Sequence, residues 1–165
     1  MIEFNSKSAT HSEFSNFYQA TFEPRTWLFE LDGHQWSTVE HYFQAQKFPT
    51  DPTLQQKIRH ALTPTSAKRL GRTKTSHFRS DWEHVKEDVM MRALRAKFTQ
   101  NPDLQKLLLE TGSEDLCEKN PSDSYWGMGR SRNGQNRMGV LLMMLREELR
   151  SHIREEQSDP SPQQG

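Results

Sequence analysis

The chain has 165 residues with 22 basic and 22 acidic side chains, so its formal net charge is zero. A neutral chain argues against the broad basic surface that nonspecific binding of DNA or RNA requires, and any anion site must be local. The single cysteine, Cys117, excludes an intrachain disulfide and a cysteine-rich metal site, and no apolar run approaches the ~20 residues of a membrane span.

Residues 1–36 are rich in aromatic side chains and lack helical periodicity, which predicts a few short strands. Asp32 and Gly33 separate the runs WLFEL and HQW, a pattern typical of a tight β-hairpin turn. The stretch FSNFY at 14–18 alternates large rings with small polar groups, which fits either a half-buried strand or a stacking surface. The general tendency of aromatic rings to lie in cores favours the strand.

The stretch STVEHYFQAQKF at 37–48 predicts a helix that carries reactive groups. Ser37 and Glu40 have the S-x-x-E spacing of a capping box, in which two side chains satisfy amides of the first turn. At about 100° per residue, Glu40, Gln44 and Lys47 share one face of this helix. A structural role in capping is the ordinary explanation for a glutamate at position 40. A solvated surface position is the ordinary explanation for Lys47.

Two short helices should follow, because each has a cap residue directly before a proline. The first begins at Asp51 and buries apolar residues at i, i+4 and i+8, namely Leu54, Ile58 and Leu62. The second begins at Thr63, and Gly71 provides its stop.

The longest helix is predicted to begin at a second S-x-x-E pair, Ser80 and Glu83, and to run to about Phe98. Another begins at Asn101, again directly before a proline, and closes at Thr111-Gly112. The C-terminal helix carries leucines at helical spacing from Leu141 onward and should stop near Glu156.

Before that last helix, residues 120–139 lose their periodicity and contain four glycines, which predicts a conformationally free loop. The same stretch holds three arginines, Arg130, Arg132 and Arg137. Backbone amides at a helix N-terminus together with guanidinium groups suit phosphate, so one interpretation is a local anion site. A solvated connecting loop is the other.

Asp123 and Trp126 lie at the start of this loop. A tryptophan among turn residues can stack on a base or a sugar, while a carboxylate accepts hydrogen bonds from hydroxyl groups. An anchoring ring and an Asx turn explain the same two residues equally well.

Together these elements predict a mainly α, multihelical single domain with a few short N-terminal β-strands at residues 1–156, and a disordered tail at 157–165. The seven histidines show no zinc-ligand spacing, so we expect neither a metal nor another cofactor. The lone cysteine and the lack of a signal-peptide pattern favour a cytoplasmic protein without membrane association. The oligomeric state is not predicted.

Motifs from about Phe14 to Leu149 resemble those of the YbiA-like, or NADAR, family of N-glycosidases. They are FSNFY, STVEHYFQAQKF, AKRLGR, DWEHVKEDVMMRAL followed by KF, LLLETG, and DSYWGMG ending in NRMG. The resemblance implies a mostly helical fold and no metal. It also implies cleavage of the C–N bond between ribose and a base-like group, either in ADP-ribosylated guanine, as nucleotide or DNA, or in phosphoribosylated intermediates of the riboflavin pathway.

The same motifs imply roles for particular residues. Glu40 matches the catalytic glutamate, and Asp123 divides the acid–base work with it. Trp82 and Trp126 match tryptophans of the site and could hold a flat base. We also expect substrate contacts from residues in or beside these motifs, namely Asn16, Phe17, Arg72 and Gly127.

In relatives that act on ADP-ribosyl-guanine, a lysine is thought to trap ribose C1 as a Schiff base. We assign this role to Lys47, because it shares a helical face with Glu40. Lys68 in AKRLGR is the competing lysine, but it lies on a different predicted helix.

The predicted function is therefore an N-glycosidase whose substrate contains ribose phosphate or ADP-ribose. Breaking the glycosidic bond develops oxocarbenium character at C1, which a carboxylate stabilises, while the departing nitrogen needs a proton. A noncatalytic module that binds ADP-ribose or NAD is the alternative, because the loop and the tryptophans would serve recognition equally well.

Overall fold

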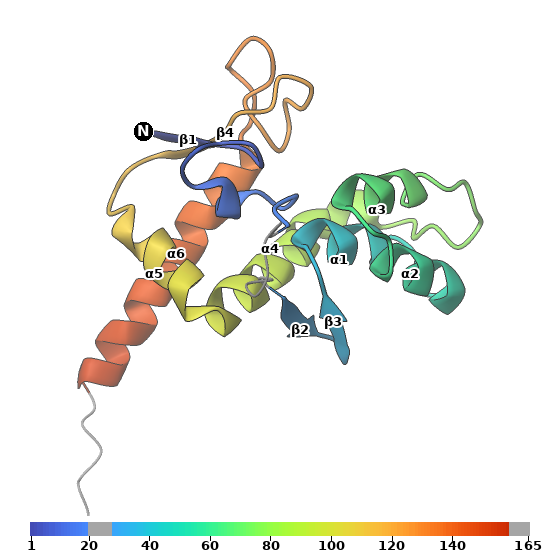
Figure 1. Cartoon of the computed structure of the whole chain (residues 1–165), viewed down its shortest axis with the longest axis horizontal. Coiled ribbons are helices and arrows are strands. Elements are labelled where there is room, and N and C mark those ends of the chain that lie inside the picture. The colour runs from blue at the N-terminus through green and yellow to red at the C-terminus, as the bar shows by residue number, and fades with distance from the viewer. Residues whose placement is uncertain (20–27, 159–165) are drawn as a thin grey trace, which may run out of the picture. The chain divides into compact units, whose positions relative to one another are not determined.

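The computed structural model describes residues 1–19 and 28–158. The chain falls into two compact units, one made of residues 4–104 and the other of residues 1–3 with the segment from 105 onward. Long and short helices dominate both units, and the strands have three residues each (Figure 1). The prediction of a mainly α fold with a few short strands is confirmed.

Helix α1 (Val39–Ala45) is the centre of the 4–104 unit, and all seven of its residues are buried. It contacts three further helices of this unit (Figure 1), which are α2 (Pro52–Arg59), α3 (Pro64–Leu70) and α4 (Trp82–Gln100). A helix that is enclosed on all sides must find internal partners for its polar side chains. In α1 these are Glu40, His41 and Gln44.

The predicted hairpin is confirmed, since β2 (Phe29–Leu31) pairs antiparallel with β3 (His34–Trp36). Asp32 and Gly33 form the turn with φ values of 53° and 76°, the positive φ that a two-residue hairpin loop demands. Asp32 also accepts a hydrogen bond from the Tyr42 hydroxyl at 2.7 Å, which ties the hairpin to α1.

The strand predicted for FSNFY is wrong. Phe14 ends a short 3-10 turn (Ser12–Phe14), and the residues after it form further turns. Phe14 is fully buried, whereas Phe17 and Tyr18 are half-buried. The core therefore takes up one ring of the three, and a single buried ring does not require the alternating backbone of a strand.

The cap position of each helix with a predicted capping box lies one residue after the predicted serine. Thr38, rather than Ser37, caps α1, and its hydroxyl accepts from the His41 amide at 3.2 Å. Asp81, rather than Ser80, is the residue that precedes α4. The S-x-x-E spacing thus located both helix starts approximately without identifying the residue at either cap.

The short helices α2 and α3 begin at the predicted caps, Asp51 and Thr63. Leu54 and Ile58 are buried as expected. Leu62 was predicted to continue their series, but α2 ends before it and Leu62 is 87% exposed. Helix α4 follows prediction more closely, with a buried stripe that includes Val89, Met90, Ala93, Leu94 and Phe98.

Helix α5 (Pro102–Glu110) starts at the predicted proline. Gly112 follows its end with φ of 61°, which is the left-handed conformation of a glycine stop.

In the second unit, β1 (Ile2–Phe4), whose first two residues belong to it, pairs with β4 (Leu116–Glu118), and α6 (Arg137–Ser158) packs on β4 (Figure 1). Strand β4 was not predicted, because three residues are too few to show a period. Cys117 lies in β4 as a free thiol and is 8% exposed. Helix α6 continues two residues beyond Glu156, and the rest of the predicted tail, 159–165, lies outside the described residues.

The glycine-rich loop between β4 and α6 is tightly packed, so the prediction of a conformationally free loop is wrong. A Cβ at Gly127 would lie 2.8 Å from the Asn120 Cβ, and one at Gly134 would lie 2.6 Å from the Gly127 carbonyl oxygen. Many amides of the loop donate to carbonyls within it. These glycines permit close backbone contact, a need that composition does not distinguish from freedom.

Candidate functional site

Glu40 is 2% exposed, and side-chain amides hold both of its carboxylate oxygens. Oε2 accepts from Asn16 Nδ2 at 2.5 Å, and Oε1 accepts from Gln44 Nε2 at 2.6 Å. The Glu40 backbone amide donates to the Asn16 carbonyl at 3.0 Å. The carboxylate is therefore fixed in an environment poor in water, where electrostatic interactions are stronger than in solvent.

Gln44 reaches Glu40 because the i, i+4 spacing places it one helical turn later. Its Oε1 is buried without a hydrogen-bond partner among residues 1–19 and 28–158. It lies against Gly71, where a Cβ would come within 1.9 Å of it. Gly71 has an ordinary helical φ of −63°, so this glycine serves the close approach of Gln44 rather than a left-handed stop for α3.

Lys47 follows α1 in a turn, and its ammonium lies over two aromatic rings. Nζ is 5.9 Å from the centre of the Phe43 ring and 5.7 Å from that of Trp82. These two rings meet edge to face with centroids 4.9 Å apart. Burial lowers the pKa of Lys47, and the Glu40 carboxylate opposes that shift without reversing it.

Two further cations lie close enough to the Lys47 amine to affect its pKa. Lys68 of α3 and Arg72 just beyond it both act to lower the pKa of Lys47. Lys68 Nζ lies 5.5 Å from the centre of the Phe17 ring. These contacts and charges connect the site residues predicted within the 4–104 unit, which are Asn16, Phe17, Glu40, Lys47, Arg72 and Trp82.

The other predicted site residues, Asp123, Trp126 and Gly127, belong to the second unit. Asp123 Oδ1 accepts from the amides of Tyr125 and Trp126 at 2.9 and 2.8 Å, which is an Asx turn. The Trp126 ring stands edge to face on the Tyr125 ring with centroids 5.0 Å apart. The structural explanation of this pair, an Asx turn and a ring contact, is thus present.

The amides predicted to bind an anion at the start of α6 are occupied. Those of Arg137 and Met138 donate to the carbonyls of Tyr125 and Trp126 at 2.9 and 3.0 Å. This part of the predicted anion site is wrong, because the preceding loop folds back and supplies the acceptors that the helix end needs.

The cations of the same loop lie around a small cavity. Arg130, Arg132 and Lys119 help to line a space of about 220 Å³. Arg132 is paired with Glu3, and the Lys119 ammonium lies 4.0 Å from the same carboxylate. Glu3 offsets part of the positive charge, and phosphate binding by these arginines stays a prediction.

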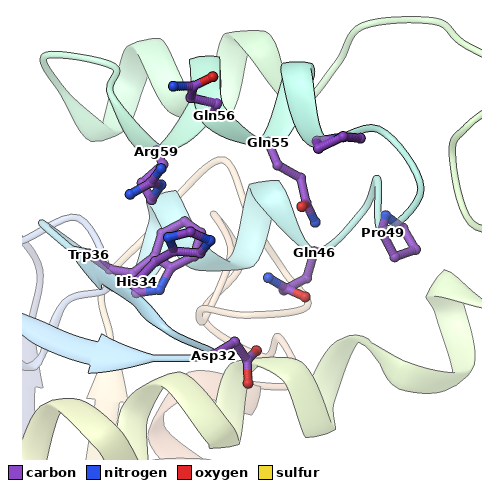
Figure 2. Close-up of a pocket in the computed structure, with 9 residues that line it drawn as sticks. Asp32, His34, Trp36, Gln46, Pro49, Gln55, Gln56 and Arg59 are labelled. Carbon is purple, nitrogen blue, oxygen red and sulfur yellow. The ribbon is translucent and has the colours of Figure 1, made fainter.

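A larger cavity of about 400 Å³ lies elsewhere in the 4–104 unit (Figure 2). Its walls come from the hairpin, from the connection after α1 and from α2, with Trp36, Gln46 and Arg59 among the residues that line it. None of the predicted site residues lines this cavity, so it does not belong to the cluster around Glu40.

Among residues 1–19 and 28–158, no group of three His, Cys, Asp or Glu side chains is placed to hold a metal ion. His41, beside Glu40 in sequence, has a structural role, with Nε2 donating to the Ala61 carbonyl at 2.9 Å and Nδ1 2.7 Å from the Thr38 hydroxyl. Burial lowers its pKa. In the same described ranges, no helix is both long and apolar enough to cross a membrane.

Residues 3–150 match the NADAR domain. The chain belongs to the NADAR family. N-glycosidase YbiA of Escherichia coli (strain K12) is 46% identical over 149 residues, which cover 90% of this chain and 88% of that protein. The NMR structure of E. coli YbiA matches with a TM-score of 0.81 at 42% identity, over 99% of this chain and 90% of that one. A maize relative, the chloroplastic riboflavin biosynthesis protein PYRR, is 44% identical over 127 residues, 72% of this chain and 20% of that protein.

The NADAR match extends through both compact units, so α1 and the loop before α6 are parts of one family pattern. At 46% identity over 90% of its length, the chain is an enzyme of the class that its relatives' name states, an N-glycosidase.

Two residues of this NADAR domain were absent from the predicted site. Gln44 was placed on the Glu40 face but given no role, although it is one of the two donors to the carboxylate. Lys97, in the KF pair after the RAL motif, is 3% exposed, and its ammonium donates to the carbonyls of Glu13 and Ser15. The signal that could have found it is a lysine inside the apolar stripe of α4.

Proposed function

We propose that the chain cleaves the bond between ribose C1 and the nitrogen of a base-like group, with Glu40 as the catalytic carboxylate. The observation that carries this proposal is a buried carboxylate, fixed by Asn16 and Gln44, beside an amine of lowered pKa at Lys47. Cleavage develops positive charge at C1. A carboxylate that is already held in place stabilises this charge without reorganisation, and its burial strengthens the effect.

The proposed substrate carries phosphate as well as ribose. Lys68 and Arg72 supply positive charge beside Lys47. The half-buried ring of Phe17 and the ring of Trp82, which is 6% exposed, are proposed to contact a flat base. Two substrate classes share these features, namely ADP-ribosylated guanine, as nucleotide or DNA, and phosphoribosylated intermediates of the riboflavin pathway. The name of the maize relative supports the second class.

Lys47 is proposed to attack C1 once the ribose ring has opened, which breaks the bond from C1 to the ring oxygen and leaves C1 as an iminium carbon bonded to the base nitrogen. The uncharged amine adds to C1, a proton passes to the base nitrogen, and the base departs. This leaves an imine at Lys47, which water hydrolyses to free lysine and the ribose aldehyde. Burial and the neighbouring cations lower the pKa of Lys47, which increases the uncharged fraction near neutral pH. Asp123 is proposed to give the departing nitrogen its proton, with Trp126 and Gly127 at the base.

Replacement of Glu40 tests the carboxylate. Glu40→Gln should lower base release by about 10²–10⁴-fold, because the charge that stabilises C1 is lost. Chromatography would measure free base from ADP-ribosylated guanosine, ADP-ribosylated DNA and the riboflavin-pathway phosphoribosylamine. Glu110→Gln, at an exposed carboxylate on α5, is the matched control and should keep full activity.

Circular dichroism and a thermal melt would confirm that Glu40→Gln is folded. A folded variant that releases base at the original rate shows that Glu40 is not catalytic. Binding of ADP-ribose by the unmodified protein without turnover of any substrate would support a binding module instead.

A further inference from the structure

Lys97 occupies a position in α4 where an apolar side chain would be expected. It is 3% exposed and falls within the buried stripe of the helix. Desolvating an amine is costly unless its donors are used. Its ammonium donates to the Glu13 carbonyl and, at 3.2 Å, to the Ser15 carbonyl, so the donors are directed at one short segment.

That segment continues directly into Asn16, the residue that touches Glu40. Asn16 donates through Nδ2 to the Glu40 carboxylate and accepts through its carbonyl from the Glu40 amide. The backbone of residues 13–16 forms turns instead of pairing in a sheet, so its carbonyls lack the regular donors of a strand. The Ser15 carbonyl accepts from the Tyr18 amide at 3.1 Å, and the other bonds to this segment come from outside it. Lys97 donates to the Glu13 and Ser15 carbonyls from α4, and Asn16 bonds the end of the segment to Glu40 of α1.

We infer that Lys97 is a positioning residue that fixes segment 13–16 so that Asn16 can hold the Glu40 carboxylate. It does not need to touch substrate, because its ammonium is already bound to the carbonyls of Glu13 and Ser15. This inference rests on the proposed function only for its effect on activity, because the bond between Asn16 and Glu40, and its dependence on Lys97, can be measured without any substrate.

The competing explanation is that Phe14 alone anchors the segment. Its ring is fully buried and meets Phe4 and Phe98 with centroids 5.7 and 6.0 Å apart. In that case Lys97 would contribute general stability to α4, and its loss would weaken the helix and the segment together.

Hydrogen exchange at the Glu40 amide separates these explanations. Glu40 is the second residue of α1, where an amide has no acceptor inside its own helix, so its protection reports the bond to Asn16. In Lys97→Met, this amide should exchange at least about tenfold faster, while the Leu94 amide inside α4 keeps its rate. Lys106→Met makes the same change at an exposed lysine on α5 and should leave both rates unaltered.

Unchanged protection at Glu40 in folded Lys97→Met would overturn the inference, and so would equal loss of protection at Glu40 and Leu94. Should Lys97→Met fail to fold, Lys97→Gln keeps an amide donor one atom nearer the backbone and should give a smaller increase in exchange at Glu40 alone. An equal increase in exchange rate at the Glu40 and Leu94 amides of that variant would also reject the inference.

A double-mutant cycle links the inference to catalysis. Asn16→Ala and Lys97→Met should lower kcat by similar factors, and the double variant should lose little more, because both act on Glu40 through one contact. Additive losses would contradict this. An unmodified protein inactive on every substrate would reject the proposed function, while the exchange rates would still decide the role of Lys97.

Discussion

The amine of Lys47 lies where a carboxylate, two cations and two aromatic rings meet, and burial lowers its pKa. Borohydride reduction in the presence of ADP-ribose should therefore add one sugar-nucleotide mass at Lys47, because reduction converts the imine at C1 into a stable secondary amine. Peptide mass spectrometry locates the adduct. Lys47→Arg should lose it, since a guanidinium keeps the charge but is not a useful nucleophile.

An adduct at Lys68 would show that the neighbouring lysine is the nucleophile. If Lys47→Arg releases base at the original rate, and neither it nor the unmodified protein forms an adduct, direct attack by water assisted by Glu40 and Asp123 is favoured instead.

Asp123 can be tested without disturbing its turn. Asparagine retains the Oδ1 acceptor that the amides of Tyr125 and Trp126 require, but it removes the charge. If Asp123 delivers the proton, Asp123→Asn should lose about 10²–10⁴-fold in base release while its melting temperature stays close to that of the unmodified protein. Full activity in Asp123→Asn, with destabilisation only in Asp123→Ala, would assign Asp123 to the turn alone.

At the scale of whole elements, the contact between α1 and α3 depends on Gly71. Gly71→Ala would place a Cβ 1.9 Å from Gln44 Oε1, so Gln44 must move away from Glu40. Helix propensity by itself would make this change stabilising. We expect a loss of about 1–3 kcal/mol in the free energy of unfolding, measured in urea, with lower base release. Thr65→Ala, on the exposed side of α3, should lower neither, and a fully stable and active Gly71→Ala would refute the role of this contact.

The sequence predicts elements well where local chemistry marks one position. Proline directly after Asp51 or Thr63 locates a helix start, because proline suits the first helical position. A serine three residues before a glutamate locates a helix start less accurately. The cap position is the next residue in both cases, Thr38 for α1 and Asp81 for α4. Close packing at Gly127 depends on how the loop folds back on Glu118, Asn120 and Asp123, and an irregular loop has no period that would predict this.

In the site, too, contacts within one helix could be predicted and contacts between distant residues could not. The spacing of Glu40 and Gln44 predicts their shared face, since it depends on one helix. The bond from Asn16 to Glu40 joins residues 24 apart, and the bonds from Lys97 to segment 13–16 join residues more than 80 apart. Periodicity carries no information about such contacts. The family motifs nevertheless include FSNFY and the KF pair, so they contain Asn16 and Lys97 without indicating what these residues contact.

For the molecule as a whole, Lys97 should make stability depend on pH. Burial lowers its pKa to about 7, whereas the unfolded chain keeps a value near that of free lysine. Between these values the unfolded state binds the additional proton, so the contribution of Lys97 to the free energy of unfolding rises with pH. Relative to Lys97→Met, the unmodified protein should gain up to about 1.4 kcal/mol per pH unit from about pH 7 to 8.5.

Urea denaturation of both proteins across this range would measure the difference. The variant serves as the reference, because groups such as Tyr42 and Cys117, whose pKa values burial raises, contribute equally to both. Parallel curves for the two proteins would contradict the prediction.

The buried thiol of Cys117 allows the second unit to be followed by itself. It is the single cysteine of the chain, it lies in β4, and burial raises its pKa, so a thiol reagent should reach it only when β4 opens. The labelling rate under native conditions then gives the free energy of that local opening. Slower labelling in the presence of substrate would show that substrate binding stabilises β4 against opening. The natural cysteine serves as the probe, so no residue needs to be introduced.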